Sequence, residues 1–301
     1  MSALFAWKSA GVSAAGDLVF AVPLKPSAVS TSWRQVEENL RRTARSARAA
    51  AGFGRVQIVI AGHDLPELGD ADGPDVSRLL VPFAVPGSPA EGKRDKARKR
   101  RFIGAWLRQH LPADEVCVVF LDADDLLHRD LGQYLRSTAA PSYVIEDGYV
   151  LATDRSLLIR HPHAFHRRCG STFICRFDRG ELPETWEDED AAFSQFGSTP
   201  EQRGHQDYDA VAAELGKPPI AVPFPAAVYV ANHAESLWVS KGRPLRTAAH
   251  PRLIVPPRRA RPILGRDFSA PDWAATIAGN ARTYAIVAQT AATFTVARLT
   301  K

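Results

Sequence analysis

The N-terminal part of the chain joins a short apolar run to a longer amphipathic segment. Residues 18–24 (LVFAVPL) are apolar and rich in β-forming side chains, and residues 25–27 (KPS) end the run, which predicts a buried strand that enters a loop. The serines within residues 30–32 are N-cap candidates for a helix over residues 33–51, where apolar side chains recur at helical spacing. We therefore expect a strand, a loop and an amphipathic helix in this order.

The same alternation continues to the middle of the chain. Residues 56–60 (VQIVI) predict a second buried strand, and residues 78–85 a third one that Pro82 interrupts. A long helix is expected over residues 93–110, and residues 116–121 (VCVVFL) form the most apolar strand. Strands that alternate with helices in this way indicate βαβ units and a mostly parallel sheet with right-handed crossovers.

The second half of the chain has a less regular pattern. Residues 143–152 predict a hairpin, because an Asp-Gly pair at positions 147 and 148 separates two apolar runs. The prolines at positions 223 and 225 favour an edge strand for the apolar run that contains them. The remaining predictions are binding loops, a helix, that edge strand and a C-terminal helix: residues 160–202, 204–215, 220–230 and 273–292.

Composition and length describe a globular chain with one main domain. The 301 residues are 45% hydrophobic and 24% charged, which is enough apolar material for a substantial core. Since α/β domains of about 200 to 250 residues are routine, we expect a main domain over residues 1–240 and a Pro/Arg-rich C-terminal extension over residues 241–301. The net charge of +5 is concentrated in one basic run, residues 93–101, so a nucleic-acid surface is not required.

Three cysteines without zinc-type spacing favour a reduced, cytoplasmic compartment: Cys117, Cys169 and Cys175. Residues 1–16 lack the apolar core of a secretory signal, and no window approaches the roughly 18 apolar residues that span a membrane. The arginines of residues 243–266 leave open a peripheral association with anionic headgroups at the inner face of the membrane.

An aspartate cluster directly follows the most apolar strand. Because side chains alternate along an extended chain, Asp122 and Asp124 should point to the same side, with Asp125 next to them. Converging carboxylates need a compensating cation to remain ionised, and their hard oxygen atoms suit Mg²⁺ or Mn²⁺, which phosphate and water complete. The alternative is a solvated acidic turn that caps a following helix.

The segment Phe120-Leu121-Asp122-Ala123-Asp124-Asp125 resembles the D-x-D motif of the GT-A glycosyltransferases, particularly glycosyltransferase family 2. The order of strand, acid-terminated second strand, basic helix and D-x-D is also similar, over about residues 18–236. The resemblance implies a Rossmann-like mixed sheet flanked by helices. It further implies an inverting, metal-dependent transfer of a sugar from a nucleoside-diphosphate sugar to a hydroxyl acceptor, such as a glycan or polysaccharide precursor.

The resemblance also assigns residues to the donor. The loop at Pro23 and Lys25 would border the nucleotide, and Asp64 would contact its base or ribose, although the family usually has two adjacent acids where this chain has His63 and Asp64. Lysines spaced three apart share a helix face, and the family's basic helix begins near the donor phosphates. Lys93 and Lys96 are therefore expected to bind the diphosphate, and Asp122 is expected to contribute to donor binding.

Two further roles come from the same resemblance. His233, which follows an apolar segment, corresponds to the late histidine that adds a metal ligand in many GT-A enzymes. The base that deprotonates the acceptor is expected at the start of a helix, which favours Asp207, with Asp188 and Asp190 as competing acids.

Two other classes of function remain as alternatives. A strand that ends in D-x-D also occurs in haloacid-dehalogenase-type phosphatases, where Asp122 would be the nucleophile. A non-enzymatic binder of anionic polymers could use residues 93–101 and the C-terminal arginines, although the nearby acids argue against nucleic acid as a partner. The donor sugar, the acceptor and the oligomeric state stay open.

Overall fold

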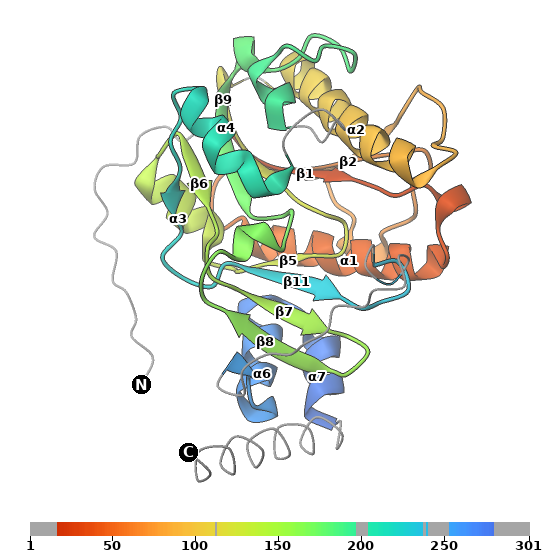
Figure 1. Cartoon of the computed structure of the whole chain (residues 1–301), viewed down its shortest axis with the longest axis vertical. Helices are drawn as coiled ribbons and strands as arrows, with labels where there is room; N and C mark the ends of the chain where they lie inside the picture. Colours follow the sequence, from red (N-terminus) through yellow and green to blue (C-terminus); the bar gives the residue numbers. More distant parts are fainter. Residues whose placement is uncertain (1–16, 112, 197–203, 237–238, 240–252, 280–301) are drawn as a thin grey trace, which may run out of the picture.

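Two β-sheets and the helices packed on them form the described part of the chain (Figure 1). The computed structural model describes residues 17–111, 113–196, 204–236, 239 and 253–279. The larger sheet has seven strands in the spatial order β10 (Ile220–Ala221), β6 (Ser142–Val144), β9 (Phe173–Asp178), β4 (Glu115–Phe120), β1 (Asp17–Pro23), β2 (Val56–Gly62) and β3 (Val76–Leu80). The smaller sheet has four, in the order β5 (Leu126–Leu127), β11 (Ala227–Ala231), β7 (Gly148–Ala152) and β8 (Leu157–His161).

The N-terminal units follow the sequence pattern closely. Strand β1 is buried throughout: Leu18, Phe20 and Val22 join the core on the α1 (Trp33–Ala50) side, while Val19 and Ala21 join the core on the α2 (Pro89–His110) side. It pairs in parallel with β2 and β4, and β2 pairs in parallel with β3. The predicted strands, the helix and the mostly parallel arrangement are confirmed here.

Two boundaries differ from the predictions because of capping and proline. Helix α2 begins at Pro89, since Ser88 accepts a hydrogen bond from the backbone N–H of Glu91 and proline suits the first helical turn. Strand β3 covers Val76–Leu80, so it starts before the predicted 78–85 and ends before Pro82, which has no N–H to donate to a ladder.

The predicted hairpin over residues 143–152 is wrong. Strand β6 belongs to the larger sheet and β7 to the smaller one, so the Asp-Gly pair lies where the chain crosses between sheets. The actual hairpin is β7–β8, and its turn contains Ser156 with a φ of 51°. The edge strand predicted over residues 220–230 is confirmed only for β10, which lies at the edge of the larger sheet, whereas the later residues form a separate strand, β11, inside the smaller sheet.

Strand β9 lies within residues 160–202, which the sequence assigned to loops. It runs antiparallel to both β4 and β6 and therefore makes the sheet mixed. The strand is buried on both faces, and its apolar run FIC-F is interrupted by Arg176, which is buried and donates to the carbonyls of Ala140 and Leu135 and to the Glu115 carboxylate. The expected Rossmann-like α/β class, a mixed sheet flanked by helices, is confirmed.

Helices cover both faces of the larger sheet. Helices α1 and α3 (Leu131–Thr138) pack on one face, and α2 and α4 (Tyr208–Glu214) on the other (Figure 1). The helix predicted over residues 204–215 is confirmed as α4, preceded by the short turn η6 (His205–Asp207). None of the helices in the described ranges is long and apolar enough to cross a membrane.

The C-terminal extension packs on the smaller sheet. Helix α6 (Pro257–Pro262), the π-helical turn η8 (Ile263–Asp267) and α7 (Pro271–Gly279) share an apolar core with β7, β8 and β11. Helix α7 confirms the start of the helix predicted over residues 273–292, whose later part lies outside the described residues. The predicted domain boundary at residue 240 also lies outside them.

Candidate functional site

Polar and charged side chains gather at the carboxyl ends of three neighbouring parallel strands. Strands β1, β2 and β4 lie side by side, and Lys25, Asp64 and the aspartates of residues 122–125 follow their ends. The aspartate turn leads directly into β5, which pairs with β11, so the turn joins the two sheets. Ligands bind at this edge in open α/β sheets. The predicted convergence of these strand ends is confirmed.

Asp122 faces two cations of α2. Lys96 Nζ lies 2.5 Å from Asp122 Oδ1, and Arg100 Nη2 lies 3.7 Å from the same oxygen. Burial acts to raise the pKa of Asp122, but the charges of Lys96 and Arg100 hold it below the ordinary value. Gly170 allows a close approach, because a Cβ atom there would be 2.9 Å from Asp122 Oδ2. Asp122 is therefore an ionised carboxylate in a confined, positively charged setting.

Asp124 and His233 form a second pair. His233 Nε2 lies 2.9 Å from Asp124 Oδ2, which brings the turn after β4 to the loop after β11. The His233 side chain is 6% exposed and that of Asp124 30%. Among the described residues, His233 Nδ1 is buried without a hydrogen-bond partner. The structure thus brings together two residues that the sequence predicted as ligands of one metal.

Asp125 points into the protein. The Ser171 hydroxyl donates to Asp125 Oδ2 at 2.6 Å, the Cys169 thiol donates to the same oxygen at 3.2 Å, and the backbone N–H of Val230 donates to Oδ1 at 3.1 Å. Burial and the neighbouring charges of Asp124 and Asp122 raise its pKa well above the ordinary value, although the Ser171 and Cys169 donors act in the opposite direction. Both of its oxygens are thus engaged within the core, and its predicted role as a metal ligand stays a prediction.

The loop after β1 is held between two carboxylates. Asp64 Oδ2 accepts the backbone N–H of Ser27 at 2.8 Å, while Glu235 accepts Lys25 Nζ at 2.6 Å and also the backbone N–H of Ser32. The Glu235 side chain is only 5% exposed. The sequence predicted Lys25 and Asp64 but not Glu235, which lies close to His233 in the chain. Pro23 ends β1 at the start of this loop.

The lysines of α2 have different surroundings. Lys93 is exposed, and Lys96 reaches Asp122, as described above. Lys99 is buried and donates to the Leu24 carbonyl at 2.8 Å and to Asp95 at 2.5 Å, and Asp95 also lies 2.7 Å from His63 Nε2. The basic run therefore contributes to the support of the β1 loop as well as to the surface.

The start of α4 is linked to the aspartate turn by Arg100, which contacts both Tyr208 and Asp122. Burial lowers the pKa of His205, and the charges that act on it are those of Asp122, Lys96 and Arg100. Asp207, the predicted base, is exposed at the N-terminus of α4. Asp188 accepts backbone N–H groups of Glu184, Asp190 and Ala191, which lower its pKa, and Asp190 is exposed. The sequence missed His205 because a single polar residue in a loop carries no periodic signal.

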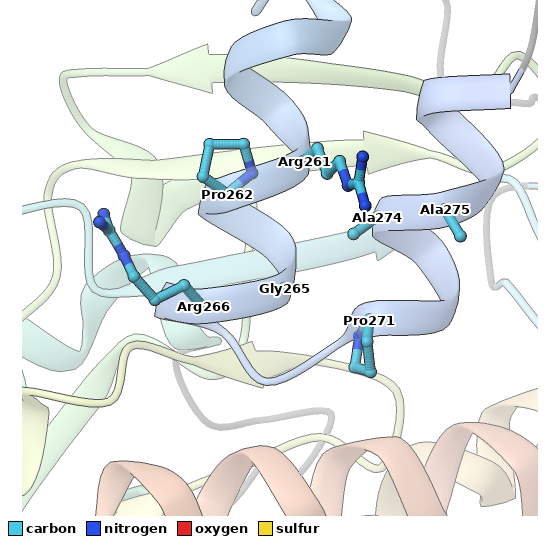
Figure 2. Close-up of a pocket in the computed structure, with 7 residues that line it drawn as sticks. All are labelled: Arg261, Pro262, Gly265, Arg266, Pro271, Ala274 and Ala275. Carbon is cyan, nitrogen blue, oxygen red and sulfur yellow. The ribbon is translucent and has the colours of Figure 1, made fainter.

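Two hollows are lined by residues of the C-terminal helices. One, of about 260 Å³, borders His233 and is lined by residues of α1, the β7–β8 turn and the loop after β11, together with Trp273 of α7. The other, of about 340 Å³, lies between α6 with η8 and α7 (Figure 2). Its lining includes Arg261 and Arg266, and none of the predicted site residues.

The described residues contain no group of three or more His, Cys, Asp or Glu side chains placed to hold a metal together. The Asp124–His233 pair offers one carboxylate and one imidazole instead. A cation that takes one or two protein carboxylates and completes its shell with phosphate and water needs no larger set. Asp124 and His233 are thus the residues that could offer a carboxylate oxygen and an imidazole nitrogen to a divalent cation.

Comparisons with known proteins add little to this geometry. No protein-family model matches the chain, and no curated protein matches it. Among solved structures, a CMP:2-keto-3-deoxy-manno-octonic acid synthetase in complex with CTP is similar at 10% sequence identity and a TM-score of 0.34, covering 76% of this chain and 96% of that one. A likeness with so low a TM-score carries no argument about substrates, so the function must be argued from the chain's own residues.

Proposed function

We propose that the chain is a metal-dependent, inverting glycosyltransferase that moves a sugar from a nucleoside-diphosphate sugar to a hydroxyl acceptor. The observation that carries the proposal is that two aspartates of the turn after β4 have different partners. Asp122 is paired with Lys96 and Arg100, whereas Asp124 is paired with His233 from a distant loop. Positively charged side chains and two possible metal ligands, Asp124 and His233, therefore lie at one strand end. The binding of a diphosphate together with its metal needs both kinds of group.

The donor would lie along the carboxyl edge of the larger sheet. Pro23, Lys25 and Asp64 border the nucleotide in this proposal, since they flank the loop between β1 and α1. Lys96 is placed to contact the diphosphate, and Lys93 lies at the exposed surface of the same helix. A divalent cation held by Asp124 and His233, beside Asp122, would offset the negative charge of the departing diphosphate. Asp125 would orient the turn from within the core.

The acceptor needs a proton acceptor near the anomeric carbon. We place it at the start of α4, where Asp207 is the acid that the sequence predicts and where His205 is near enough for its charge to lower the pKa of Asp122. Asp188 is less suited, because three backbone N–H groups stabilise its charged form and lower its basicity.

The alternative of an anionic-polymer binder loses support from the burial of α2. Three members of its basic run are buried: Lys99, Arg100 and Arg101. Arg101, for example, donates to the Trp186 carbonyl and pairs with Glu189 at 2.8 Å. A surface that binds a polymer through counterion release needs exposed cations, and only part of this run provides them.

Isothermal titration of UDP, GDP and CDP, each with Mn²⁺ and with EDTA, tests the proposal. We expect one nucleoside diphosphate to bind with Mn²⁺ and at least tenfold more weakly with EDTA or with Asp124→Ala, a loss of about 1.4 kcal/mol. Asp70→Ala, at an exposed site on η2 (Gly69–Ala71), is the control. Metal-independent binding that Asp124→Ala leaves unchanged would contradict the metal site. A screen of nucleotide-sugar hydrolysis then identifies the donor.

Peripheral membrane association stays a separate proposal. Arg258, Arg259 and Arg261 are exposed on α6, and Arg266 is exposed on η8. Clustered arginines attract acidic headgroups by about 1 kcal/mol each near the surface. Co-sedimentation with phosphatidylserine vesicles, compared with phosphatidylcholine vesicles, measures this directly.

A further inference from the structure

His205 is held in one orientation by a backbone carbonyl. Its Nδ1 atom lies 2.8 Å from the carbonyl oxygen of His166, which belongs to the turn η3 (Phe165–Arg167). A carbonyl oxygen only accepts hydrogen bonds, so Nδ1 must carry the hydrogen in this contact. In the neutral ring the lone pair is then on Nε2. This contact therefore selects the tautomer in which Nε2 can take up a proton.

The same arginine that faces Asp122 anchors the helix that His205 precedes. Arg100 Nη1 donates to the Tyr208 hydroxyl at 2.7 Å, and that hydroxyl donates to the Phe196 carbonyl at 2.6 Å. Tyr208 is the first residue of α4 and is 1% exposed. Arg100 thus contacts both the end of β4 and the start of α4. This anchor and the bond of His205 to η3 fix the position of His205 at the start of α4.

Burial favours a neutral ring for His205 at pH 7. Burial lowers its pKa below the ordinary 6.5, and of the charges that act on it, Asp122 raises the pKa whereas Lys96 and Arg100 lower it. A neutral imidazole can accept a proton, and an imidazole whose pKa is near the working pH is an efficient base. Asp207, by contrast, is exposed, and its side chain caps no helix.

We propose that Nε2 of His205, and not the carboxylate of Asp207, accepts the proton of the acceptor hydroxyl; this inference rests on the proposed glycosyl transfer. The acceptor oxygen forms a bond to the anomeric carbon while the bond from that carbon to the diphosphate oxygen breaks. The electron pair of the broken bond leaves with the diphosphate, and the hydroxyl proton moves to Nε2. The imidazolium that results lies near Asp122, whose negative charge stabilises it.

The test compares His205→Gln with Asp207→Asn in the full chain, with Asp209→Asn, an exposed α4 residue, as the control. We expect His205→Gln to lower kcat by about 10² to 10⁴-fold, with the KM for the donor and the Kd for the nucleoside diphosphate within threefold of wild type. The decrease in kcat caused by Asp207→Asn should be at least tenfold smaller than the decrease caused by His205→Gln. The acid limb of the wild-type kcat/KM profile, expected below pH 6.5, should be absent in His205→Gln.

Imidazole rescue makes the test independent of any one variant. If His205→Gln fails to fold, His205→Ala assayed with added imidazole replaces it, and recovery of turnover supports the base role. The inference is overturned if Asp207→Asn loses more turnover than His205→Gln, if the acid limb survives in His205→Gln, or if both His205 variants lose diphosphate binding. Failure of wild type to bind any nucleoside diphosphate would instead reject the glycosyltransferase proposal, and the His205 role with it.

Discussion

The carboxyl edge of the larger sheet and the C-terminal side of the smaller sheet are built by different means. At the first, half-buried carboxylates face cations or imidazole, as in the Asp122–Lys96 and Asp124–His233 pairs. At the second, Leu264 and Phe268 pack with the apolar residues of β7, β8 and β11. The first region holds the polar groups at the edge of the larger sheet, and the second stabilises the smaller sheet, which includes β5 and β11 next to these groups. Substitutions should therefore separate binding from stability.

The largest effect is expected in the apolar region. Phe268 is 1% exposed, and its ring centroid lies 5.9 Å from that of Tyr149 and 5.4 Å from that of His128. Phe268→Ala should lower the free energy of unfolding by about 3–5 kcal/mol, because it leaves a cavity in a packed core. Urea denaturation measures the loss. Diphosphate affinity of the folded fraction should be unchanged, and a changed affinity would show that the two regions are not separable.

Two adjacent aspartates provide the next contrast. Asp125→Ala leaves three buried donors without their acceptor and should cost about 1–3 kcal/mol of stability. Asp124→Ala, at a partly exposed carboxylate, should change stability by less than about 0.5 kcal/mol but abolish the effect of Mn²⁺ on diphosphate binding. Thermal unfolding and titration of both variants check the pair. Equal losses of stability would reject the division of roles.

The third prediction concerns the two lysines of α2 that were expected to clamp the diphosphate. Lys96→Met should weaken nucleoside-diphosphate binding by about 10- to 150-fold, since a charge-assisted contact contributes about 1.5–3 kcal/mol. Lys93→Met is the matched change at an exposed position and should weaken binding less than threefold. Titration with each variant at the same ionic strength decides between them. Similar losses would mean that both lysines reach the phosphates.

The smallest effect is a pH dependence at the apolar side. His128 packs against Phe224 and Phe268, accepts the backbone N–H of Asp130 at Nδ1, and has a pKa lowered mainly by burial. The unfolded state then binds a proton at His128 more readily than the folded state does. The contribution of His128 to the free energy of unfolding is therefore constant above about pH 6.5, and stability falls as the pH drops below that value. The Tm of His128→Asn, which keeps an acceptor, should change less between pH 7.5 and pH 5.5 than the wild-type Tm.

The N-terminal half was predictable because local pattern and tertiary structure agree there. The strands of residues 18–24, 56–60 and 116–121 are buried on both faces, so their apolar runs are continuous. The aspartates were predicted from their position after such a strand, and Lys96 from the basic run of a helix. The association of His233 with the aspartates came from the family resemblance, because the sequence pattern alone does not show that the loop after β11 folds back onto the turn after β4.

The second half was predicted less well because tertiary contacts override the local signals. The Asp-Gly pair at 147 and 148 is a hairpin signal, yet the chain there crosses between two sheets. The apolar run of β9 is interrupted by the buried Arg176. Its guanidinium group contacts Glu115 of β4 and the Leu135 carbonyl of α3, and these partners are distant in the sequence. His205 and Glu235 were missed for a similar reason, since each is defined by contacts with residues distant in sequence.

The three cysteine thiols can be used to measure how often the protein opens around the aspartate turn. Cys117 and Cys175 lie on the adjacent strands β4 and β9, and Cys169 donates to the carboxylate of Asp125. All three are buried, which raises the pKa of Cys117 to about 11 and those of Cys169 and Cys175 as well. The reactive thiolate is therefore scarce in the native state. Alkylation of these thiols should proceed only as fast as the structure around them opens. The labelling rate at Cys169 would therefore follow the local unfolding of the aspartate turn.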